Sequence, residues 1–343
     1  MIKSLISLRG IFILFIFFHH AGVYSGGGTL SVAFFFVLSS FSLTLGYKDR
    51  IFLSEFSYKQ YLIRRCIKFF PLHWITLIAD IPLVLMTAFH WWLIPVFFIN
   101  AALLQSLVPI KEVYFSFNAV SWFLADILFF ALSFPFLLKG IYRRTVKQRI
   151  AIAFLLMIFY CGVIVLLPGS FQHAILYISP FVRILDFIFG IYLALFYLDI
   201  KDKKAFNRVN SYGSLFLIII LGLIALLVAE SCLLGSLEYI SPLYWPLLAL
   251  LILCAAIPKN GIIPLMENRV ILLLGKYSFT IFLVHRLVIR YTEKLLLFNI
   301  KYIQVCFCLV VTIVLSILIE RYILNPITQC LTKRSQQSTT ARS

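Results

Sequence analysis

Long apolar runs recur along the whole chain, and they constrain its fold more strongly than any other feature. An α-helix needs about 20 mostly apolar residues to cross a bilayer, whereas a β-barrel would show short alternating segments. Of the 343 residues, 62% are hydrophobic, compared with about half in a soluble domain. We therefore predict an all-α fold, a polytopic helical membrane protein in a lipid bilayer. The candidate spans are 5–24, 29–47, 69–89, 93–108, 118–138, 150–167, 176–198, 211–230, 242–257, 270–290 and 302–323.

The charges between these runs set the expected topology, because short loops rich in Lys and Arg stay in the cytoplasm. If all eleven runs crossed, the loop 139–149, which is basic and has no acid, would face outward. The run 93–108 is short and follows the interfacial group His90-Trp91-Trp92, so we expect it to be re-entrant or interfacial. About ten crossings then remain, with both termini cytoplasmic. We expect a single membrane domain over 1–332 and a disordered cytoplasmic tail over 333–343.

The formal charge of +17 first suggests a nucleic-acid partner, but the basic residues gather in the short loops where the orientation rule puts them. We therefore expect no nucleic acid. The seven cysteines lie mostly within apolar runs, and Cys306-x-Cys308 cannot complete a zinc site, so we predict no metal and no disulfide framework. The amino terminus has some features of a signal peptide, but Arg9 and His20 would be odd in a removable segment, so we expect it to be retained.

The first apolar run carries Arg9 and His20, two residues that are costly inside a membrane and that usually face a functional cavity. They are eleven positions apart, about three helical turns, so they share one face at a separation of about 16 Å along the axis. His19 lies about 100° away from that face. A long polar ligand could therefore touch Arg9 at one end and His20 at the other.

A basic loop follows the second run and ends in Arg65 and Lys68, which are neighbours on a helix at spacing i,i+3. Together with Arg9 they could form a cationic cluster at the cytoplasmic mouth, suited to phosphate groups. The same residues would also be explained as simple anchors of a helix at the membrane boundary. The residues alone leave both interpretations open.

Further polar residues interrupt the later runs. Arg183 and Asp186 are spaced to form a structural ion pair on one helix face. Asp126 lies within an apolar run, and Trp122 near it could be an interfacial anchor. A lone histidine such as His285, near the outer end of its run, is more often interfacial than catalytic. Its depth is comparable with that of His20, which modestly raises the odds of a shared site.

Four segments, spread over nearly the whole chain, carry a family resemblance. The pattern of Arg9, ten residues and His20 is followed by Phe35-Phe36-Val37-Leu38-Ser39-Ser40-Phe41, then by a basic motif over 65–71 and a tryptophan-to-proline segment over 122–135. The fourth segment, 275–285, fits G-x-x-S-Y-x-x-Y-L-x-H, with Phe279 and Phe282 in place of the tyrosines, and Arg183-x-x-x-Phe187-x-x-Gly190 is also similar. In this order and spacing they resemble the acyltransferase-3 family of integral membrane acyltransferases, which modify bacterial surface glycans.

The resemblance implies ten helices in the plasma (inner) membrane of a bacterium and an acyl-CoA co-substrate, commonly acetyl-CoA, with no permanently bound cofactor. It implies a glycan or lipid-linked sugar hydroxyl as acceptor. Arg9, Arg65 and Lys68 would bind the donor and His20 would be the catalytic residue. Four further residues are candidates for supporting roles: Ser39, Trp122, Asp126 and His285.

The chain departs from the family pattern at four positions. Lys68 stands where a second arginine is usual, which keeps the charge but loses the bidentate fork. Ser40 replaces a glycine, Ala33 stands where many members have an aspartate, and Ile127 where many have a glutamate. The last two changes leave His20 without a predicted acidic partner.

The sequence thus predicts a membrane O-acyltransferase in which His20 acts as general base on an acceptor hydroxyl. An acyl-enzyme on His20 or Ser39 is the less favoured chemical order. A transporter or flippase for a glycan or lipid intermediate is the alternative function, because it too would need a polar cavity. A membrane protein with interaction functions only would leave the charged helix faces unexplained.

Overall fold

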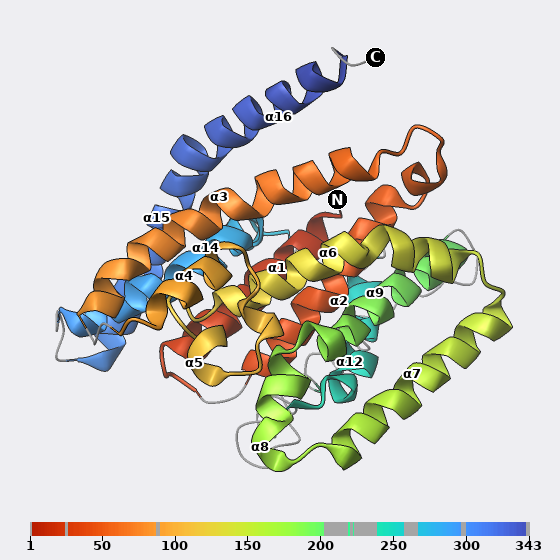
Figure 1. Ribbon diagram of the computed structural model, residues 1–343, viewed down its shortest axis with the longest axis horizontal. Helices are drawn as coiled ribbons and strands as arrows, with labels where there is room; N and C mark the ends of the chain where they lie inside the picture. Colours follow the sequence, from red (N-terminus) through yellow and green to blue (C-terminus); the bar gives the residue numbers. More distant parts are fainter. Residues whose placement is uncertain are drawn as a thin grey trace.

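Eight helices are long and apolar enough to cross a membrane in the computed structural model, which describes residues 2–24, 27–86, 90–201, 219, 222, 239–256, 267–295 and 300–340 (Figure 1). The described residues contain helices and no strand, so the predicted polytopic helical fold is confirmed. The first four of these helices are α1 (Lys3–His20), α2 (Gly28–Tyr47), α3 (Tyr58–Leu85) and α6 (Ser121–Tyr142). The others are α7 (Val146–Leu166), α9 (Pro180–Ile200), α14 (Arg269–Lys294) and α15 (Lys301–Ile319), which continues through a π-helical turn into α16 (Asn325–Thr340).

The remaining predicted spans divide into three cases. The run 242–257 corresponds to the shorter helix α12 (Trp245–Ala256), and the run 211–230 lies outside the described residues apart from 219 and 222. The run 93–108 forms the nine-residue helix α4 (Leu93–Ala101), which is about 14 Å long and cannot cross a 30 Å core. Two short helical segments follow it, Gln105–Leu107 and α5 (Lys111–Tyr114). The backbone of residues 333–340 continues α16, and the boundary predicted at residue 332 stays a prediction.

The helices differ in how much surface they leave for lipid. Helices α2 and α6 are largely buried within the bundle, whereas most side chains of α7 are exposed and the helix lies along one edge of the molecule (Figure 1). The exposed side chains of α7 include Phe154, Leu155, Val165 and Leu166. Because these side chains are apolar, the exposed face of α7 suits contact with lipid tails.

Glycines allow close contacts between two pairs of helices. At Gly10 and Gly275 helices α1 and α14 approach so closely that a Cβ on Gly275 would strike the carbonyl oxygen of Ile6. Likewise, a Cβ on Gly190 of α9 would strike Val37 of α2. Small residues at such points let helix backbones pack directly in membrane proteins. The first contact fixes Arg9 and His20 of α1 against α14, which carries Ser278 and His285.

Substitution of Gly275 tests this contact. We expect Gly275→Ala to lower the apparent melting temperature of the purified protein, because the new methyl meets backbone atoms that cannot rotate away, at a cost of about 1–3 kcal/mol. The matched control is Gly162→Ala in α7, where no atom lies within 4 Å of the added methyl. There we expect no loss, since alanine is the better helix former. Equal melting temperatures for the two variants would contradict a backbone contact at Gly275.

Candidate active site

Helix α1 carries Arg9 and His20 into two different cavities. Arg9 lines a cavity of about 240 Å³, and His20 lines one of about 590 Å³. The first, the basic cavity, is lined by Arg9, Arg65 and Lys68 with Ser39, Ser42, Tyr47, Ser278 and a set of apolar residues. The second, the histidine cavity, is lined by His19, His20, Trp122, His173, Tyr177, Tyr239, Arg286 and Arg290 with smaller and apolar residues.

The basic cavity brings together the three cations that the sequence predicted to cluster. Within the described parts of the chain, none of these cations forms an ion pair with an acid. Arg65 is held in place by Tyr47, whose hydroxyl accepts a hydrogen bond from Nη2 at 2.9 Å, and by the Tyr61 ring, 4.9 Å from the guanidinium carbon. Cations that are oriented but not neutralised suit an anionic ligand with several phosphates.

Ser278 is a cavity residue that sequence reasoning missed. It lines the basic cavity, and its hydroxyl is buried with no hydrogen-bond partner in the structure. It lies seven residues before His285 on α14, two turns away and therefore on nearly the same face. That spacing within the segment 275–285 could have identified Ser278 from the sequence. In the structure its unbonded hydroxyl lines the same cavity as the three cations.

His20, which lines the histidine cavity, forms a hydrogen-bonded pair with His285, which is fully buried and lines neither cavity. His20 Nδ1 lies 2.8 Å from His285 Nε2, and His285 Nδ1 lies 3.1 Å from the carbonyl oxygen of Ile281. A carbonyl can only accept, so Nδ1 of His285 is its donor and, in the neutral ring, its Nε2 is an acceptor. His20 must then donate from Nδ1, which leaves its Nε2 unprotonated.

This pair resolves the missing acidic partner. The hydrogen-bond partner of His20 is a histidine 265 positions away, and among the described residues no carboxylate is bonded to either ring. A backbone carbonyl at its far end selects the tautomer. The arrangement offers one basic nitrogen, Nε2 of His20, as the atom that can take a proton from a ligand.

A layer of aromatic side chains separates the two cavities, whose linings share no residue. The rings of Phe123 and Phe282 lie 4.8 Å apart on the side of the basic cavity, and the Phe282 ring lies 5.9 Å from that of His285. Phe36 stacks on Phe123 at 4.7 Å. The sequence suggested one groove between Arg9 and His20, whereas the structure has two cavities with bulky rings between them.

The other residues singled out from the sequence fall in different places. Ser39 lines the basic cavity, and Trp122 lines the histidine cavity with its ring 5.0 Å from that of Tyr177. Asp126 is completely buried and lines neither cavity, so the structure does not bring it to His20. Arg183 and Asp186 form the predicted ion pair at 3.1 Å, with both side chains fully buried.

The family departures also have positions in this arrangement. Ile127 lines the basic cavity and Ala33 is buried, while Ser40 donates a hydrogen bond to the carbonyl of Val37 at 3.0 Å, beside Gly190. Lys68 lines the basic cavity and is exposed to it. Among the residues that the structure describes, no three His, Cys, Asp or Glu side chains are placed to hold a metal ion.

Eight helices long and apolar enough to cross a membrane, a cavity lined by three cations and a hydrogen-bonded histidine pair fit a multi-pass membrane enzyme. Residues 2–321 match the family described as "Acyltransferase domain", so the chain belongs to the acyltransferase-3 family and the resemblance seen in its motifs is confirmed. It is also similar to the protein named "Acyltransferase MdmB" of Streptomyces mycarofaciens, with 26% identity over 296 residues, which is 78% of this chain and 70% of that protein. No solved structure matches the chain.

Proposed function

We propose that this membrane acyltransferase transfers an acetyl group from acetyl-CoA to a hydroxyl of a cell-surface polysaccharide or lipid-linked glycan. The observation that carries the proposal is the placement of two groups on one helix. The unprotonated Nε2 of His20 lines one cavity, and Arg9, eleven residues earlier, lines the cavity that holds the cations. A donor with phosphates at one end and a reactive thioester at the other suits this separation of about 16 Å.

The donor would bind in the basic cavity. Its phosphates would pair with Arg9, Arg65 and Lys68, and the Ser278 hydroxyl offers a further hydrogen bond. The pantetheine arm would then run along α1 toward His20. Because Phe123 and Phe282 lie on that route, their rings would have to separate for the thioester to pass.

His20 would act as the general base. As the acceptor oxygen attacks the thioester carbonyl, its proton moves to Nε2, the carbon–sulfur bond breaks, and the thiolate of CoA leaves with its electron pair. The proton on His20 then passes to the thiolate, which restores the enzyme. His285 keeps the Nδ1 proton of His20 in place throughout, which holds Nε2 as the reacting atom.

The charge pattern supports a cytoplasmic basic cavity and an outward histidine cavity. The plasma membrane of a bacterium is the location that the family implies. The basic loop 139–149 and both termini would lie in the cytoplasm. The donor would therefore enter from the cytoplasm and the acceptor from the opposite side.

The proposal is tested by transfer of labelled acetyl groups in membranes that contain the protein. We expect label from acetyl-CoA to enter a glycan fraction, and mass spectrometry of glycan from a deletion strain to show loss of an acetyl mass. The transporter alternative predicts a different result, namely an unexported precursor that accumulates with its acyl groups unchanged. That result would overturn the proposed reaction.

The cations of the basic cavity give a prediction of their own. We expect Arg9→Gln or Arg65→Gln to raise the KM for acetyl-CoA by at least about tenfold, because each removes a charge-assisted contact to a phosphate. S-acetyl-pantetheine lacks the nucleotide phosphates, so with this donor the variants should match the unsubstituted protein. Lys276→Gln, which removes an exposed cation of α14, is the control and should leave both donors unaffected. Equal losses with both donors would contradict phosphate binding at these residues.

A further inference from the structure

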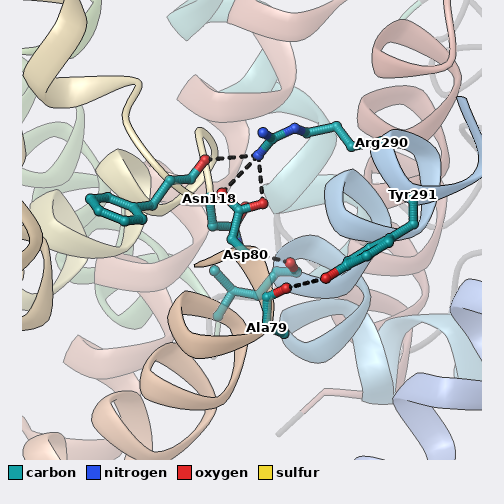
Figure 2. A network of polar contacts seen from close by, with 7 residues as sticks. Ala79, Asp80, Asn118, Arg290 and Tyr291 are labelled. Carbon is teal, nitrogen blue, oxygen red and sulfur yellow. Dashed lines mark hydrogen bonds and ion pairs between the residues drawn. The ribbon is translucent and has the colours of Figure 1, made fainter. Parts of the chain in front are cut away.

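Two arginines of α14 line the histidine cavity, and the first to consider is Arg290, whose charge is balanced. Its Nη1 donates to both carboxylate oxygens of Asp80, at 2.5 and 2.7 Å, and to the carbonyl of Phe117 at 3.1 Å (Figure 2). The neighbouring Tyr291 hydroxyl donates to the carbonyl of Ala79 at 2.6 Å (Figure 2). This network fastens α3 to α14, so Arg290 is accounted for as a structural group.

Arg286 lies one turn before Arg290 on the same face of α14 and has no such partner. It is half-buried, and no residue that the structure describes forms an ion pair or a hydrogen bond with its guanidinium. Asp80 is already held by Arg290, and Glu293 lines a separate cavity with Lys301. An unpaired guanidinium is costly within a membrane bundle, and an anion that enters the cavity would offset that cost.

Aromatic side chains also line the cavity. The His173 ring lies 5.2 Å from the ring of Tyr177 and 5.2 Å from that of Tyr239, and Trp122 also packs on Tyr177. Burial, with the nearby charge of Lys111, lowers the pKa of His173 to about 4, so this residue is neutral at pH 7 and adds ring surface but no charge. Flat aromatic surface beside a few polar groups suits a ring-shaped ligand with apolar faces.

The volume of the cavity fits such a ligand. At about 590 Å³ it lies in the range of roughly 300–1,000 Å³ that is usual for small-molecule sites. It contains the basic nitrogen of His20, the unpaired cation of Arg286 and the aromatic side chains. If a sugar places a hydroxyl at His20, an acidic group on the same sugar could therefore reach Arg286.

We infer that the acceptor is an anionic sugar, whose carboxylate or phosphate binds Arg286 while a hydroxyl of the same sugar meets Nε2 of His20. This inference rests on the proposed acyl transfer and deepens it by naming the class of acceptor. A uronic acid and a sugar phosphate would present the same anionic chemistry to Arg286. Arg286 would select the acceptor by its charge and would leave the chemistry itself to His20.

The test uses the purified full-length protein with acetyl-CoA and three simple acceptors. Methyl glucuronide carries a carboxylate, glucose 1-phosphate carries a phosphate, and methyl glucoside is neutral. We expect kcat/KM for at least one anionic acceptor to exceed that for methyl glucoside by about tenfold. The better of the two anionic acceptors shows whether Arg286 binds a carboxylate or a phosphate. Arg286→Gln should bring this ratio close to one by raising the KM for the anionic acceptor, and Arg286→Lys should keep much of the preference. The control is Lys276→Gln, which removes an exposed cation of the same helix outside the histidine cavity and should leave the ratio unchanged.

Two outcomes would overturn the inference. One is transfer in which methyl glucoside is as good an acceptor as both anions, and the other is an unchanged ratio in Arg286→Gln. If no acceptor is acetylated, the proposed reaction is in doubt, and binding of the three compounds by calorimetry then decides on Arg286. Tighter binding of an anion that is lost in Arg286→Gln would support the site, and equal binding of all three would exclude it.

Discussion

Replacement of His20 by alanine is expected to lower kcat for acyl transfer by about 1,000-fold, with little change in the KM for acetyl-CoA. General-base catalysis contributes roughly 10²- to 10⁴-fold, and His20 offers the basic nitrogen that the relay through His285 leaves unprotonated. The donor contacts lie in the other cavity, beyond Phe123 and Phe282, so they should persist. The measurement is steady-state transfer of labelled acetyl groups by the purified variant.

Two controls separate loss of the base from loss of the fold. His19 neighbours His20 and lines the same cavity, but its position on α1 is turned about 100° away, so His19→Ala should cost far less activity. Added imidazole should restore part of the activity of His20→Ala, because the cavity has room for it. Retention of more than a tenth of normal activity by His20→Ala would contradict the assigned base.

The position of Ser39 also bears on the chemical order. Ser39 lines the basic cavity, on the other side of the aromatic layer from His20. An acyl group on Ser39 would therefore form away from the nitrogen that activates the acceptor. Direct transfer from donor to acceptor needs no intermediate on Ser39. The separation of Ser39 from His20 therefore favours direct transfer.

The sequence was sufficient for the features that depend on one helix at a time. Apolar length predicted the eight spans among the described residues, and the shortness of 93–108 predicted that it does not cross. Helical phase placed Arg9 and His20 on cavity-lining positions of α1. The pairing of Arg183 with Asp186 followed from spacing on α9 in the same way. Local periodicity decides all of these features, and it can be read without knowledge of neighbouring helices.

Contacts between helices were beyond such reasoning. The sequence directed the search for a partner of His20 to Ala33 and Ile127, neither of which can carry a proton, while His285 could be matched only by its depth. The aromatic layer arises because Phe123 of α6 meets Phe282 of α14, and nothing in either segment indicates that the two rings meet. Side-chain packing between helices fixes both features, and one sequence does not record it.

His285 gives the second large effect that we expect. His285→Phe should lower kcat by about 100-fold while the KM for acetyl-CoA stays near normal. Phenylalanine fills the space but cannot accept a hydrogen bond from Nδ1 of His20. Without that acceptor His20 can adopt the other tautomer, in which Nε2 carries the proton and can no longer act as the base. A loss of this kind is severe in enzymes whose catalytic histidine loses the group that orients it.

Comparison with a second variant distinguishes this orienting role from simple packing. Glutamine at position 285 can present a carbonyl oxygen to His20 Nδ1, so His285→Gln should be at least tenfold more active than His285→Phe, although phenylalanine is the better filler of a buried site. If His285 only fills space, His285→Phe should be the more active variant and should also have the higher melting temperature. Similar melting temperatures with higher activity for glutamine would identify the hydrogen bond as the contribution of His285. Equal kcat in both variants would remove His285 from the relay and leave His20 to be oriented by other groups.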